Sequence, residues 1–162
     1  MAPEVQSSLV EGSDGAFYGT TAGAGTNGLG SVFRVTANGT FTTIVSFDGT
    51  NGAMPSRTLV ADGDSAFYGT TLRGGTNDFG TIFRVTDDGA LTTLMAFETN
   101  RPSPSGLFHG NDGALYGNYS SVPDPGVTNE TIFRFCSNQL TVVTSFTVTN
   151  RVTWYDGMVQ GK

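Results

Sequence analysis

The tripeptide Phe17-Tyr18-Gly19 returns as Phe67-Tyr68-Gly69 and, in altered form, as Leu115-Tyr116-Gly117. A second marker, Phe-Arg, recurs with a spacing of 50 residues at positions 33–34, 83–84 and 133–134. Self-similarity at a fixed period of about 20–50 residues is typical of repeat architectures. The sequence therefore predicts one repeat domain over residues 1–162, with units at about 7–55, 56–104 and 105–150.

Each unit divides at its turn-forming residues into four short apolar stretches, which in the first unit are 8–11, 16–21, 31–36 and 40–47. Thr, Val, Phe and Tyr dominate these stretches and favour strands. The pair Asn38-Gly39 predicts a two-residue hairpin turn with positive φ at both positions. The third unit has the weaker turn signal Asn138-Gln139. The expected fold is all-β, with three four-stranded antiparallel propeller-type blades of about 50 residues.

The end of the chain continues the pattern. Residues 157–161 resemble 8–12 and 106–110, so 151–162 is predicted to hold the first strand of a truncated fourth unit. Propellers usually have about 4–8 blades, so three units make about half a ring. An uncovered apolar edge favours association with another chain. We expect self-association, most simply as a homodimer, or a place in a longer array.

Charge and composition exclude several classes of function. The net charge is −6 and no basic stripe is present, so nucleic acid is not an expected partner. Apolar runs are far shorter than the roughly 20 residues of a membrane-spanning helix. The single cysteine, Cys136, excludes an intrachain disulfide. The stretch 23–28 matches G-x-G-x-x-G, but a predicted strand follows it instead of a helix, so no nucleotide or other cofactor is expected.

The repeated motif also resembles a known family. Asp-Gly-x-Phe-Tyr-Gly-Thr-Thr, a Gly-Gly loop and Gly-Thr-Ile-Phe-Arg are similar to the Gloeo/Verruco (GloVer) tandem repeat, and the match lies at 14–21, 66–71, 74–75 and 80–84. That repeat occurs in large bacterial surface or secreted proteins. The resemblance implies a propeller-like β fold and an extracellular or cell-surface location in a bacterium. It implies no particular activity, and the first residues show no signal-peptide pattern.

Charged residues repeat with the units. Arg34, Arg84 and Arg134 share a strand phase, and Asp14, Asp64 and Asp112 each precede the repeated Tyr by four residues. Their repetition favours a structural role, as Arg–Asp pairs or Asp-capped turns. The alternative is a ring of polar groups that binds a polyanion or a sugar.

His109 is the only histidine, so no histidine-pair metal site is expected. Its candidate roles are structural or as a general acid or base that Asp112 orients.

Catalysis, if present, would use carboxylates. The third unit departs most from the repeat in the loop 122–126, which makes Asp124 and Glu130 candidate acids. Glycoside hydrolysis needs two carboxyl groups about 5–10 Å apart, and Tyr119 and Trp154 are candidate sugar-stacking platforms. Two functions follow as hypotheses: a non-catalytic module that binds a glycan or protein or serves as a scaffold, and a carbohydrate-active hydrolase or lyase.

Overall fold

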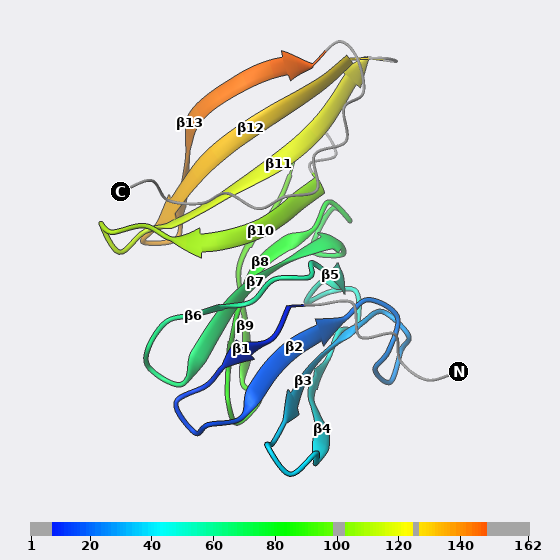
Figure 1. The fold of residues 1–162 in the computed structure, drawn as a ribbon. Helices are drawn as coiled ribbons and strands as arrows, with labels where there is room; N and C mark the ends of the chain where they lie inside the picture. The colour runs from blue at the N-terminus through cyan, green and yellow to red at the C-terminus, as the bar shows by residue number, and fades with distance from the viewer. Residues whose placement is uncertain (1–7, 99–102, 125–126, 149–162) are drawn as a thin grey trace.

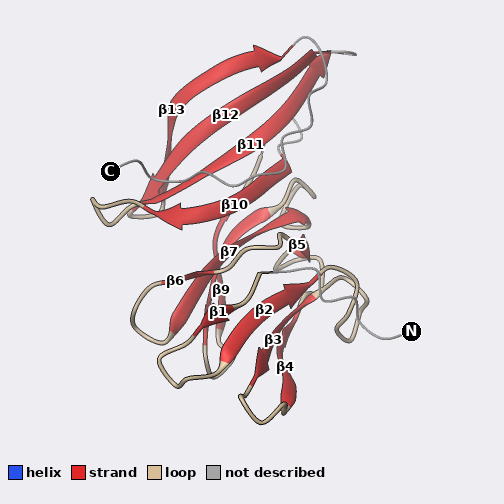
Figure 2. Cartoon of the chain, viewed as in Figure 1, coloured by secondary structure: helices blue, strands red, loops and turns tan. Residues whose placement is uncertain are grey.

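The computed structural model describes residues 8–98, 103–124 and 127–148, which form three antiparallel sheets and no helix (Figures 1 and 2). The predicted all-β fold is confirmed. The first sheet has the order β1-β2-β3-β4. Its strands are β1 (Val10–Glu11), β2 (Phe17–Thr21), β3 (Ser31–Val35) and β4 (Phe41–Ser46).

The second sheet has five strands instead of the four expected. They are β5 (Ala53–Pro55), β6 (Val60–Ala61), β7 (Ala66–Arg73), β8 (Thr81–Thr86) and β9 (Leu91–Ala96). Both β5 and β6 pair with β7, at Pro55–Thr71 and Val60–Tyr68 respectively. β7 is eight residues long against five for β2, so its edge has room for two short partners.

The third sheet is built from longer strands: β10 (Ser103–His109), β11 (Leu115–Asp124), β12 (Val127–Cys136) and β13 (Gln139–Val148), in that order. β10 pairs with β11 from Leu115 to Ser120, with a register shift between Pro104 and Leu107. The second sheet uses two strands, β5 and β6, at the corresponding edge. The predicted strand within 151–162 lies outside the described residues.

The hairpin turns correct the prediction made from Asn38-Gly39. Only Gly39 has a positive φ, of 87°, and its N–H donates to the carbonyl of Thr36 at 2.9 Å. Asn38 stays at negative φ because its side-chain oxygen accepts from the N–H of Thr40 at 3.2 Å, an Asx turn. The two-residue turn with both φ values positive occurs at Ser137 and Asn138, where the sequence signal is weaker.

The core lies between the sheets, which follow one another along the molecule (Figure 1). Between the first two sheets, Tyr18 packs on Phe67 with ring centroids 4.2 Å apart, and Phe47 packs on Phe83 at 5.2 Å. The side of a sheet that holds the positions of Tyr18, Val32 and Phe47 is called here its forward face. The side that holds the positions of Leu9, Phe17 and Phe33 is called its rear face.

The contact between the second and third sheets uses the same two faces. Phe97, on the forward side of the second sheet, lies 6.2 Å from Phe133 on the rear side of the third. Ile82 and Leu107 are buried in the same cluster. The second sheet thus offers its rear face to the first sheet and its forward face to the third. Among the described residues, the rear face of the first sheet and the forward face of the third sheet have no sheet packed on them.

Candidate functional site

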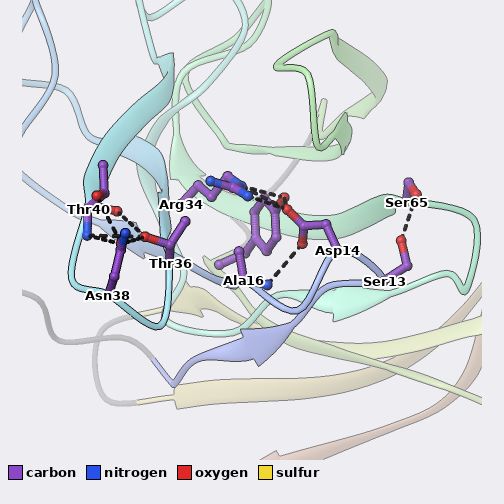
Figure 3. Close-up of polar contacts among 9 residues, drawn as sticks. Ser13, Asp14, Ala16, Arg34, Thr36, Asn38, Thr40 and Ser65 are labelled. Carbon is purple, nitrogen blue, oxygen red and sulfur yellow. Dashed lines mark hydrogen bonds and ion pairs between the residues drawn. The ribbon is translucent and has the colours of Figure 1, made fainter.

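An ion pair fixes the turn that leads into β2 (Figure 3). Asp14 Oδ1 accepts from the N–H of Ala16 at 3.1 Å, while Oδ2 accepts from Arg34 Nε at 2.9 Å and Nη2 at 2.6 Å. The hydroxyl of Tyr18 donates to the same oxygen at 3.1 Å. Arg34 and Tyr18 are paired across β2 and β3, so their side chains leave the sheet on one face. This set, Asp14, Tyr18 and Arg34, is called here the clamp.

The clamp holds its groups in their ordinary charge states. The hydrogen bond from Arg34, and then that from the Ala16 N–H, lowers the pKa of Asp14 below its usual value of 3.8. Burial raises the pKa of Tyr18 above its usual value of 10.0. A general acid of glycoside hydrolysis needs a carboxyl group with a raised pKa. The clamp therefore has the electrostatics of a structural ion pair.

The third sheet repeats the clamp at equivalent positions. Asp112 accepts from the Ala114 N–H at 3.1 Å, from Tyr116 at 3.1 Å and from Arg134 Nε at 2.9 Å. The Ala114 N–H, followed by Arg134, lowers the pKa of Asp112.

The second sheet changes the partner. Arg84 binds Asp62 at 3.2 Å, so the expectation that Asp64 is the repeated acid was wrong. Asp62 stands where the other units have Gly12 and Gly110. Asp62 Oδ1 also accepts from the N–H of Asp64 at 2.8 Å, which organises the same turn from two residues earlier. The three predicted arginines thus lie on three different sheets, each bound to a carboxylate of its own sheet.

His109 lies at the end of β10 and contacts the second sheet. Its ring meets that of Tyr68 edge-on with centroids 5.9 Å apart, and its buried Nε2 has no hydrogen-bond partner among the described residues. The carboxylate of Asp112, the predicted orienting group, is bound to Ala114, Tyr116 and Arg134.

The predicted catalytic set is spread over the third sheet. Glu130 Oε1 accepts from Ser120 at 2.6 Å on the forward face. Tyr119 points to the rear face, where it packs on Phe97 and Phe133 with centroids 5.8 and 6.0 Å away. Asp124 pairs with Val127 at the end of β11, four positions from the partner of Glu130. At about 3.3 Å per residue, Asp124 and Ser120 are ~13 Å apart along β11. Asp124 is therefore far from Glu130, which pairs with Ser120.

The remaining candidates are Trp154, a metal site and Cys136. Trp154 lies outside the described residues. Within the described ranges, no group of three His, Cys, Asp or Glu side chains is arranged to hold a metal ion, and Cys136 is a free, half-buried thiol. The same part of the chain contains no helix of the length and apolarity that crossing a membrane requires.

A hollow of about 390 Å³ opens on the forward face of the third sheet, lined by Phe108, Gly110, Asn111, Asp112 and Tyr116. It is called here the aromatic hollow, because Phe108 and Tyr116 stack along it with centroids 5.4 Å apart. Phe108 lies outside the repeated motifs. The available signal was that Phe108 stands where the other units have Val10 and Val60.

One exposed apolar side chain, that of Phe146, lies on the same face. Phe146 is 52% exposed, while the residues at the same repeat position, Phe47 and Phe97, are 0% and 4% exposed. The strand register supports this equivalence, since β4, β9 and β13 pair in the same way with Val32, Ile82 and Ile132.

Comparison with known proteins identifies the family. No curated protein matches the chain. The family model of the Gloeobacter/Verrucomicrobia repeat matches residues 2–162, and the three stacked sheets carry the repeated motifs at equivalent positions. The chain therefore belongs to the Gloeobacter/Verrucomicrobia repeat family.

Proposed function

We propose that this chain is a non-catalytic β-propeller repeat module that binds a protein partner through the forward face of its third sheet. The observation that carries the proposal is Phe146, which is half exposed at a position that is buried in both other sheets. Phe146 and the stacked rings of Phe108 and Tyr116 give this otherwise polar face exposed apolar groups, and such groups at positions that are packed elsewhere support an interaction surface. The module serves as a scaffold, at the bacterial surface or outside the cell as the family resemblance implies.

The ionisable groups support a non-catalytic role. The repeated acids Asp14 and Asp112 have lowered pKa values, and each is bound by an arginine, a tyrosine and a backbone N–H. Groups that recur with the same partners in successive sheets stabilise the repeat. A catalytic carboxyl group usually departs from such symmetry and has its pKa moved toward neutrality.

Glycan binding is the second candidate, and the aromatic hollow favours it. Stacked aromatic rings beside the carboxylate of Asp112 and the amide of Asn111 offer a platform and polar partners for a sugar ring.

The test uses one strand to supply both variant and control. Phe146 and Val142 lie on β13 with similar exposure, 52% and 50%, but on opposite faces, because they pair with Glu130 and Phe133. The immobilised chain is offered the surface-protein fraction of its host, and bound proteins are identified by mass spectrometry. We expect a protein that the wild type and Val142→Asp retain and Phe146→Asp loses.

Two outcomes would count against this function. Retention that Phe146→Asp leaves unchanged would remove the forward face as the binding surface. Glycan cleavage that Asp124→Asn or Glu130→Gln abolishes, with the circular dichroism spectrum unchanged, would replace the module with a carbohydrate-active enzyme. A glycan array probed with the wild type and with Tyr116→Ser tests sugar binding separately. Binding that Tyr116→Ser abolishes would favour the glycan-binding function.

A further inference from the structure

We propose that the forward face of the third sheet binds the rear face of the first sheet of a second copy of this chain, so that two copies close head to tail. This inference rests on the proposed function, which makes that face a docking surface, and it names the occupant. Two sheet–sheet contacts of the required kind already exist within one chain.

Both internal contacts join a forward face to a rear face through the same positions. Phe47 meets Phe83 at 5.2 Å between the first two sheets, and Phe97 meets Phe133 at 6.2 Å between the next two. Phe146 is the third member of the first series, and Phe33 is the remaining member of the second. A third contact of the same kind would therefore bring Phe146 of one copy to the Phe33 position of another, where Phe41 stacks over the buried Phe33 ring and would form the contact surface.

The rear face of the first sheet is covered at Phe33, which is 2% exposed, but it exposes apolar side chains around that residue. Leu9 is 51% exposed, whereas Leu59 and Leu107 at the same repeat position are 5% and 4% exposed. Phe41, stacked on Phe33 at 4.9 Å, is 46% exposed on this face. One chain thus carries both halves of an interface that it already forms twice.

The aromatic hollow fits the same interface. Tyr116 occupies the position of Tyr18, whose ring is covered by Phe67 at a centroid distance of 4.2 Å. The counterpart of Phe67 in the first sheet is Phe17, which is half-buried. In the assembly, Phe17 of the second copy enters the hollow and lies against Tyr116.

Contacts between unlike faces generate either a closed ring or an open filament. Propellers close with about 4–8 blades, and two copies of three sheets supply six. A closed dimer uses every exposed forward and rear face, with two identical interfaces. We therefore assign the dimer as the closed state, and an open filament would leave one face of each kind exposed at its ends.

The experiment measures the solution mass of four proteins by light scattering. The wild type and the control Val142→Asp are expected at twice the 16.9 kDa of one chain. Phe146→Asp and Leu9→Asp, which alter the two faces separately, are each expected at 16.9 kDa or to show strongly weakened dimers. Both side chains are about half exposed in the single chain, so circular dichroism should show the fold retained.

Mixing the two variants distinguishes head-to-tail binding from other arrangements. A mixed pair contains one interface with Phe146 and Leu9 both intact, so mixing Phe146→Asp with Leu9→Asp should restore part of the dimer signal. A dimer that Leu9→Asp leaves unchanged would mean that two forward faces bind each other, and it would overturn the inference. A monomeric wild type would also overturn it. If that monomer still retained another protein through Phe146, the proposed function would stand alone.

Discussion

Gly12 shows how closely the clamp is packed around a single backbone position. A Cβ atom there would lie 2.6 Å from Cε2 of Tyr18 and 2.9 Å from Oδ1 of Asp14. We predict that Gly12→Ala lowers the free energy of unfolding by about 1–3 kcal/mol, because the Tyr18 ring must move from its buried place. Urea denaturation measures the change.

The control for this substitution is Gly23→Ala. No atom lies within 4 Å of a Cβ at Gly23, so its effect should stay within about 0.5 kcal/mol. Equal losses from the two substitutions would show that the Tyr18 ring moves aside without cost.

The second clamp makes a separate prediction about which acid matters. Asp62 has a side chain only 11% exposed and binds Arg84, while Asp64 is exposed at the surface of the turn. Asp62→Asn should therefore lower the free energy of unfolding by about 1 kcal/mol, and Asp64→Asn should have little effect. Thermal unfolding of the two variants compares them directly, and a larger loss from Asp64→Asn would contradict the structure.

The identity of that acid could not be predicted from the four-residue spacing alone. The spacing correctly pairs Asp14 with Arg34 and Asp112 with Arg134. It fails in the second unit because two acids flank Gly63, and the choice depends on how the side chains fill the turn. The sequence feature that indicates the right acid is Asp62 itself, which stands where the first and third units have Gly12 and Gly110.

Burial differs sharply between Phe47, which directly follows β4, and its counterpart Phe146 in β13. Phe47 is fully buried and Phe146 is half exposed at the same repeat position. Phe47→Ala is predicted to cost about 3–5 kcal/mol of unfolding free energy, because it leaves a cavity between two sheets. Phe146→Ala should cost less than about 1 kcal/mol within a single chain.

This comparison requires monomeric protein, because association of two copies would add to the measured stability. Unfolding is therefore measured in the Leu9→Asp background, so that association adds nothing to the stability. A cost at Phe146 equal to that at Phe47 would mean that some part of the same chain covers the forward face of the third sheet.

The hairpin turns predict substitutions of opposite sign. Asn138 has a φ of 59°, which glycine adopts freely, so Asn138→Gly should raise the unfolding free energy by up to about 0.5 kcal/mol. Asn38 has a negative φ and its side chain accepts from Thr40, so Asn38→Gly should lower it by about 1 kcal/mol. Thermal melts of both variants give the two signs, and a shared sign would contradict the turn assignment.

Strand positions were predictable where the pattern alternates locally. The stretches predicted at 31–36 and 40–47 correspond to β3 (Ser31–Val35) and β4 (Phe41–Ser46). β5 was not predictable, because a three-residue strand ending in Pro55 has no alternation and pairs only where β7 extends far enough to meet it. The turn type at Asn38 depended on a side-chain hydrogen bond, which the Asn-Gly rule omits.

Across the molecule, acid should weaken the fold. The acids with lowered pKa values include Asp14, Asp48, Asp78, Asp88 and Asp112, each bound by N–H or hydroxyl donors. A carboxyl group with a lower pKa in the folded state binds protons more readily when unfolded, so its stabilisation is complete above the usual pKa of 3.8. That stabilisation is lost as the pH falls through the lower, folded-state value.

We therefore expect the Tm to be nearly level from pH 7 to about pH 5 and to fall steeply below about pH 4. The double variant Asp14→Asn/Asp112→Asn should start with a lower Tm and lose less of it on acidification, because two of the titrating groups are gone. Scanning calorimetry across this range measures both. A double variant with the same acid slope as the wild type would show that the clamps do not contribute to it.

The 50-residue period predicted that the sheets stack on one another. It did not predict which sheet faces stay uncovered. Phe47, Phe97 and Phe146 occupy equivalent positions of the repeat, so the period alone favours the same burial for all three. Whether such a residue is buried depends on the next sheet, which is a property of the neighbour. Phe146 carries the sequence of a core residue on a surface, and that mismatch required the structure.

The order in which the sheets are synthesised gives the stacked arrangement a further consequence. Every sheet is made from one contiguous segment of the chain, so each can form as soon as its own residues have emerged. Until the second sheet arrives, the growing chain exposes Phe47, and until the third arrives it exposes Phe97. The described part of the chain keeps a surface of this kind at Phe146, which is 52% exposed. Chaperones that recognise nascent chains by their apolar sheet faces would therefore continue to bind this protein until a second copy covers that surface.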